Sequence, residues 1–129
     1  WEKGYIPFVN LSVGNHGNMW TAQDIVNGEL DDDIRIWAKA FKDWSEGGEK
    51  RALIAPLEEM NGCWTSYSGE PDEFILAFRH VQELFQKEGV NPRAVSWVFA
   101  PYGWSPEGLE FERFYPGDEY VDVVGFSGF

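Results

Sequence analysis

The sequence is poor in the residues that build metal centres and covalent cross-links. Its 129 residues include one cysteine, Cys63, and two histidines, His16 and His80. One cysteine excludes a disulfide within the chain, and two histidines so far apart form no pair at metal-ligand spacing. We therefore predict neither a metal nor another cofactor, and we expect His80 to be a surface or packing residue of a helix.

Long apolar runs and targeting signals are also missing. No stretch of about 18 apolar residues is present, so no membrane-spanning helix is predicted. No segment has the charged, apolar and small-residue regions of a signal peptide. The chain begins with Trp1 rather than Met and reaches an apolar strand almost at once, which suggests a piece of a longer protein.

Basic residues are few. Ten Lys and Arg stand against 22 Asp and Glu, and the formal charge is −12. Nucleic acids and anionic membranes would repel such a chain, so neither is expected as a partner, whereas a neutral polysaccharide is compatible with it. Aromatic residues make up 17% of the chain; most are expected in the core, and the others offer flat faces on which sugar rings can stack.

Apolar runs and helical stripes alternate along the chain. Runs of β-branched and aromatic residues predict strands, and apolar residues at intervals of three and four predict amphipathic helices. Acidic residues before the stripes and glycines after them mark the helix ends. The predicted strands are 5–13, a run that starts at Ala52, 94–100 and 120–126. Two long helices are predicted, one over 31–44 and one that starts at Pro71 and stops before Gly89. Two shorter helical segments are predicted as well: a turn opened by Thr21 within the loop 14–28, and 109–115.

Strands that alternate with helices imply βαβ crossovers and a parallel sheet. The fold class is therefore α/β, and residues 1–129 are expected to form a single unit. The pattern alone leaves open whether this sheet is a segment of a barrel or a small doubly wound sheet.

The most informative stretch runs from Ala52 to Trp64, because it passes from an apolar strand to two carboxylates, an Asn-Gly turn and an indole. Carboxylates at the carboxyl end of a buried parallel strand lie where α/β barrels keep their chemistry. Successive strand side chains point to opposite sides, so one of Glu58 and Glu59 is expected to be the working acid and the other its neighbour. Solvated loop carboxylates are the alternative.

The segment 56–64 resembles the acid/base motif of glycoside hydrolase family 26, the β-mannanases, usually written His-Glu-Met-Asn-Gly-x-Trp. Four further segments agree with the family in the same order. They are Ile25-Val26-Asn27-Gly28 followed by Asp32, Ile36, Trp37 and Ala38; Phe78-Arg79-His80-Val81; Trp97-Val98-Phe99-Ala100-Pro101; and Tyr115-Pro116-Gly117-Asp118-Glu119-Tyr120-Val121-Asp122.

The resemblance implies a partial TIM (β/α)8 barrel. About four parallel strands with intervening helices would correspond to strands three to six, a half-barrel fragment. Its two edge strands would expose unpaired backbone. We therefore expect either a homodimer through the exposed edges or a fragment whose remaining strands are absent from this chain.

For the site, the resemblance implies that Glu59 is the general acid/base and that the Trp64 indole stacks on the sugar at the cleavage point. A retaining glycosidase also needs a second carboxyl about 5 to 5.5 Å away. The family has this nucleophile on the seventh strand, so the chain is expected to lack it. Solvated surface positions are predicted for the other candidate acids, Glu107, Glu110, Glu112 and Glu119.

Two positions depart from the family. Glu58 stands where a His commonly helps to bind the sugar, and Phe129 stands where a Tyr hydroxyl would orient the nucleophile, a hydrogen bond that Phe cannot donate. The predicted substrate-binding residues are Trp64, Glu58, Asn61, Trp97, Tyr102, Trp104 and Phe129.

The resemblance implies a fragment of a retaining hydrolase that cleaves β-1,4-mannan or a related β-glycan, with the longer protein secreted or extracellular. By itself the isolated chain is expected to be inactive. A glycan-binding or self-assembling half-barrel without catalysis is the alternative, and a small α/β domain of unrelated function is the third reading.

Overall fold

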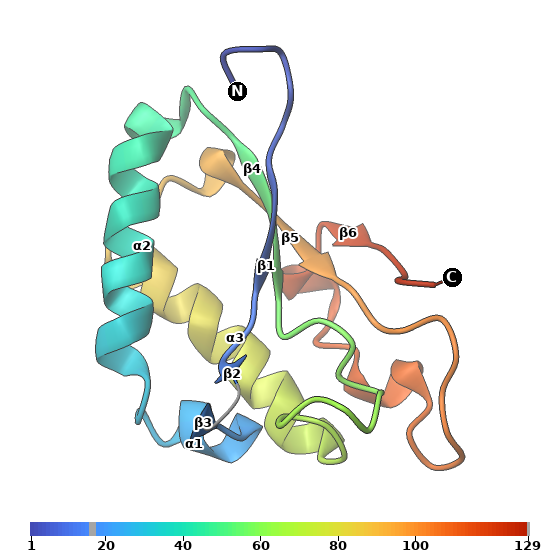
Figure 1. Cartoon of the computed structure of the whole chain (residues 1–129). Helices are drawn as coiled ribbons and strands as arrows, with labels where there is room; N and C mark the ends of the chain where they lie inside the picture. Colours follow the sequence, from blue (N-terminus) through green and yellow to red (C-terminus); the bar gives the residue numbers. More distant parts are fainter. Residues whose placement is uncertain (16–17, 129) are drawn as a thin grey trace.

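The computed structural model describes residues 1–15 and 18–128. Its main sheet has four strands in the order β1-β4-β5-β6, and every neighbouring pair is parallel. Figure 1 shows these strands side by side in the centre of the molecule. The strands are β1 (Phe8–Leu11), β4 (Ala52–Pro56), β5 (Val95–Phe99) and β6 (Val123–Val124).

Two long helices, α2 (Asp31–Ser45) and α3 (Pro71–Lys87), lie next to each other on one side of the sheet (Figure 1). Acidic residues in the first turn of each helix favour the positive end of the helix dipole. Every residue of the apolar stripe predicted for α3 is buried; these residues are Phe74, Ala77, Phe78, Val81, Leu84 and Phe85. The shorter helices are α1 (Ala22–Val26), η1 (Glu46–Gly48), η2 (Pro92–Ala94), η3 (Phe111–Phe114) and η4 (Asp118–Tyr120).

The strands send alternate side chains to opposite faces of the sheet. Ile54 of β4 and Phe99 of β5 join the large core that α2 and α3 complete. Ala55 and Val98 point to the other face, where they form a small second cluster with Ala100. The helix side therefore carries most of the core, and the carboxyl ends of β1, β4 and β5 meet at one edge of the sheet.

The predicted order of strands and long helices is confirmed, but two strands are shorter than predicted. The strand expected over 5–13 is limited to Phe8–Leu11, because β1 pairs only with the short strand β4. The strand expected over 120–126 is limited to Val123–Val124, which pairs with the last residues of β5, while Tyr120 ends η4. Both strands pair on one side only within the described residues, and self-association through them stays a prediction.

The loop predicted over 14–28 contains more structure than expected. Its helical turn is confirmed as α1, whose Thr21 side chain accepts a hydrogen bond from the Asp24 N–H while the Asp24 carboxylate accepts one from Thr21 N–H. A short antiparallel pair, β2 (Gly14–Asn15) with β3 (Asn18–Met19), was not predicted. Two-residue strands carry no usable periodicity, so the sequence pattern could not reveal them. His16 lies outside the described residues.

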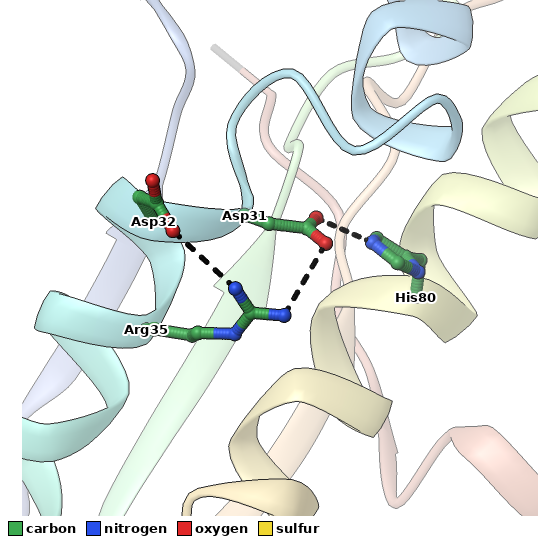
Figure 2. A network of polar contacts seen from close by, with 4 residues as sticks. All are labelled: Asp31, Asp32, Arg35 and His80. Carbon is green, nitrogen blue, oxygen red and sulfur yellow. Dashed lines mark hydrogen bonds and ion pairs between the residues drawn. The ribbon is translucent and has the colours of Figure 1, made fainter.

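A polar network joins the start of α2 to the middle of α3 (Figure 2). The Nε2 atom of His80 lies 2.7 Å from Oδ1 of Asp31, and Arg35 pairs with Asp31 at 3.6 Å and Asp32 at 3.3 Å. His80, expected to be a surface or packing residue, thus ties the two helices together through Asp31. None of the helices in the described residues is long and apolar enough to cross a membrane.

The helix-facing core predicts a large difference between two apolar residues of α3. Phe78 is 0% exposed and Leu76 is 51% exposed. Phe78→Ala should lower the free energy of unfolding by about 3–5 kcal/mol, because it leaves a cavity in the core. Leu76→Ala should change it by less than about 0.5 kcal/mol. Urea unfolding of both variants measures the difference, and equal losses would contradict the assignment of α3's buried face.

Candidate active site

The turn after β4 is fixed by its backbone. Leu57 and Glu59 both have left-handed backbone angles, with φ of 56° and 58°, which residues other than glycine seldom adopt. The Leu57 N–H donates to the carbonyl oxygen of Leu11, the last residue of β1, and the Glu59 N–H donates to that of Ala100, just after β5, each at 2.9 Å. Two neighbouring strands therefore hold this turn, and Glu59 stands where their carboxyl ends meet.

Each carboxylate oxygen of Glu59 accepts a hydrogen bond. The Trp64 Nε1–H donates to Oε2 at 2.6 Å, and the Ser127 hydroxyl donates to Oε1 at 2.6 Å. Trp64 belongs to the loop after β4, whereas Ser127 follows β6. The backbone of Ser127 also bridges to Tyr102 and accepts a hydrogen bond from Gly103 N–H. Segments that follow β4 and β6 thus converge on one carboxylate.

Ser127 was not predicted as a site residue. Serine is common in loops, and nothing in Gly-Phe-Ser-Gly-Phe distinguishes it by composition. The available signal was positional: the residue follows the last predicted parallel strand, whose carboxyl end lies at the same edge as that of β4.

The indole of Trp64 lies between Glu59 and the loop after β5. Its side chain is 53% exposed, and its ring meets the Tyr102 ring edge-on, with centroids 5.0 Å apart and an interplanar angle of 87°. Trp104, in the same loop as Tyr102, is 64% exposed. The structure therefore brings Glu59, Trp64 and Tyr102 together and leaves Trp104 exposed in the adjoining loop.

Asn61 has a different position from the ligand-facing one expected for it. Its side chain is 0% exposed. Its amide donates to Tyr102 O at 2.9 Å, Trp104 O at 3.3 Å and the Ser105 hydroxyl at 2.8 Å, and its Oδ1 accepts from Tyr102 N–H at 2.8 Å. A buried amide with these partners supports the 102–105 loop rather than contacting a ligand.

Trp97 also lies apart from Glu59. Its ring packs against Phe85 of α3, with centroids 5.3 Å apart, on the helix side of β5. Phe99 shares that face and packs against Phe74, also of α3. Trp97 was expected to bind substrate, but it lies on the face of β5 that α3 covers; strand periodicity separates two faces without showing which one is covered. Phe129 lies outside the described residues.

Glu58 is half-buried beside the turn. Its Oε2 atom is buried without a hydrogen-bond partner in the described structure. Burial raises the pKa of the Glu58 carboxyl; a hydrogen bond from its own backbone N–H lowers it, and the charge of Glu59 raises it further. The Tyr67 hydroxyl donates to the backbone oxygen of Glu58 at 2.7 Å, and burial raises the pKa of Tyr67 as well.

The other acidic residues considered as nucleophiles are exposed. Glu110 accepts a hydrogen bond from Gly108 N–H, and no described contact joins any member of this set to Glu59. Among the described residues no group of three or more His, Cys, Asp or Glu side chains could hold a metal ion. The four exposed acids are Glu107, Glu110, Glu112 and Glu119.

A pH-dependent stability follows from Glu58. A raised pKa in the folded state means that the folded chain binds more protons than the unfolded chain above the ordinary value of 4.5. The free energy of unfolding should therefore fall as the pH rises through the window from 4.5 up to the folded-state pKa. Glu58→Gln should lack this fall, so that its stability relative to the unsubstituted chain increases across the window.

Urea unfolding of the two proteins between pH 4 and pH 8 measures this difference. Glu107→Gln, which removes an exposed carboxyl, is the control and should give no comparable trend. A constant difference between Glu58→Gln and the unsubstituted chain at every pH would contradict the burial of this carboxyl.

The model of a known family matches most of the chain. Residues 12–129 match the model described as glycosyl hydrolase family 26. The chain is 32% identical to Endoglucanase H of Acetivibrio thermocellus over 114 residues, which cover 82% of the chain and 12% of that protein. It is 26% identical to a mannan endo-1,4-beta-mannosidase of Bacillus subtilis over 154 residues, covering all of the chain and 41% of that protein.

The comparison of structures identifies the fold. All of the chain superposes on the Bacillus subtilis mannanase man26, with a TM-score of 0.78 at 22% identity, and covers 45% of that protein. The four parallel strands and their helices are therefore part of a (β/α)8 barrel. The chain spans less than half the length of these similar proteins. The numbering of its strands as three to six stays a prediction.

Proposed function

The chain belongs to glycosyl hydrolase family 26, and we propose that Glu59 is the general acid/base of a retaining hydrolase that cleaves β-1,4-mannan or a related β-glycan. The observation that carries this proposal is the pair of hydrogen bonds that Glu59 accepts from Trp64 and Ser127 at the carboxyl edge of the sheet. A side chain held at both oxygens keeps the fixed geometry that proton transfer requires.

The substrate class is supported by the similar proteins. Their names describe a mannan endo-1,4-beta-mannosidase, a mannanase and an endoglucanase. The exposed indole of Trp64, with Tyr102 against its edge and Trp104 in the next loop, offers aromatic surface for a neutral sugar chain. The net charge of −12 does not oppose such a ligand.

The two donors to Glu59 are chemically unequal. An indole N–H can only donate, whereas a serine hydroxyl can donate or accept. Oε2 therefore remains the acceptor for Trp64, and Oε1 is the oxygen that carries the transferable proton. As the glycosidic carbon–oxygen bond breaks, the leaving oxygen takes this proton and the Ser127 hydroxyl donates to the Oε1 that is left negative.

Hydrolysis with retention of the anomeric configuration also requires a second carboxylate, about 5 to 5.5 Å from the acid, that attacks the anomeric carbon of the sugar. We propose that this nucleophile comes from barrel segments outside the 129 residues, because the chain spans less than half of its relatives. On this proposal the chain binds the glycan and holds the acid/base, and hydrolysis needs the complete barrel.

The role of Glu59 predicts a loss of hydrolysis. In a complete barrel that contains this segment, Glu59→Gln should lower the rate of mannan hydrolysis by about 100-fold or more, because a positioned acid or base contributes at least that much. Glu107→Gln changes the same functional group at an exposed position and should leave the rate unchanged. An unaltered rate in Glu59→Gln would refute the acid/base assignment.

The role of Trp64 predicts a loss of affinity in the 129-residue chain itself. Trp64→Ala should weaken mannohexaose binding about tenfold, measured by calorimetry, a change of about 1.4 kcal/mol. Trp37→Ala is the control, because Trp37 is 43% exposed on α2 and lies outside the site. Equal affinities for Trp64→Ala and Trp37→Ala would remove Trp64 from the binding surface.

A further inference from the structure

The indole of Trp64 has to meet two requirements at the same time. The Nε1–H must reach Oε2 of Glu59, and one part of the ring must remain open to a ligand. Because Trp64 lies in a loop after β4 and more than half of its side chain is exposed, the core does not hold it. Other contacts have to fix the ring.

Gly62 packs directly against the Trp64 indole. A Cβ atom added to Gly62 would lie 2.3 Å from Cζ2, 2.4 Å from Cε2 and 2.7 Å from Cη2 of Trp64. Real Cβ atoms essentially never approach other heavy atoms within 3.0 Å. The indole therefore occupies the volume that any side chain at position 62 would need.

This requirement for glycine concerns space rather than backbone conformation. Eight glycines of the described residues have left-handed φ angles, and Gly62 is not one of them. Alanine can therefore adopt the backbone of position 62 without the strain that a left-handed angle imposes. A substitution here acts on the indole and not on the turn.

The side of the ring is fixed by Tyr102, and Tyr102 is in turn fixed by Asn61. The Asn61 amide bonds both the N–H and the C=O of Tyr102. Two adjacent residues thus support Trp64. Gly62 contacts the indole directly, and Asn61 acts through the Tyr102 ring that packs against its edge.

We propose that Asn61 and Gly62 are positioning residues for the acid/base, because they set where the Trp64 indole lies and hence whether its N–H reaches Glu59. The inference rests on the proposed function for the acid/base role of Glu59 and for the effect on glycan binding, whereas the hydrogen bond between Trp64 and Glu59 can be tested without either. A methyl group at position 62 would displace the Trp64 ring. The displaced ring loses its hydrogen bond to Oε2 of Glu59, and its exposed face no longer lies where the ligand would contact it.

Gly62→Ala in the 129-residue chain tests this. In ¹⁵N-labelled protein the Trp64 Nε1–H signal, identified by its absence from Trp64→Phe, should leave its hydrogen-bonded position and move toward the position that it has in Glu59→Gln. Affinity for mannohexaose should fall about tenfold. The urea midpoint should stay close to that of the unsubstituted chain, which separates positioning from a general loss of stability.

Gly128→Ala is the matched control, since within the described residues no heavy atom beyond its chain neighbours lies within 4 Å of its added Cβ, and its φ is not left-handed. It should change neither the signal nor the affinity. A Trp64 signal in Gly62→Ala at the same position as in Gly128→Ala would overturn the proposal.

The two proposals fail in different ways. If Gly62→Ala moves the signal while Trp64→Ala binds mannohexaose normally, positioning holds and the stacking role of Trp64 is wrong. Should Gly62→Ala not fold, Tyr102→Ala removes the lateral support at a half-exposed position instead. A Trp64 signal and an affinity that both survive Tyr102→Ala would overturn the proposal.

Discussion

The site depends on one constraint, the attachment of the turn after β4 to the strands on both sides of it. The N–H groups of Leu57 and Glu59 donate to backbone oxygens at the ends of β1 and β5, and both residues adopt left-handed angles to do so. Such angles cost of order 1–3 kcal/mol each and persist only where the surroundings hold them. The parallel order of the sheet supplies these surroundings, so the position of Glu59 is a property of three strands.

The helices were predictable because their signals are local. The apolar stripe of α3 runs from Phe74 to Phe85, about three turns of helix. Pro71 opens the helix, and the acidic first turn and the glycine beyond its end agree with the same boundaries. The limits of β1 and β6 were not predictable, since a strand extends only as far as its partner pairs with it. Residues such as Tyr5 and Phe126 have high β-propensity and still lie outside the sheet.

The sequence pointed to the acid and the indole of the candidate site, and much less to the residues around them. The motif resemblance pointed to Glu59 and Trp64, which the structure joins by a hydrogen bond. It also pointed to Asn61, whose amide is used inside the protein, and Trp97 was chosen from a pattern that does not distinguish the two faces of a sheet. Ser127 could be found only from the neighbour order of the strands, which is a tertiary property.

The bond between Ser127 and Glu59 joins residues 68 positions apart in the sequence. Bringing together residues of such separation closes a long loop, which costs conformational entropy. Ser127 follows β6, a strand of two exposed residues, whereas the large core lies between the sheet and α2 and α3. Opening of this segment would therefore release one oxygen of Glu59 while the core stays intact, so the geometry of this carboxylate depends on the local stability of the β6 edge more than on the global stability of the fold.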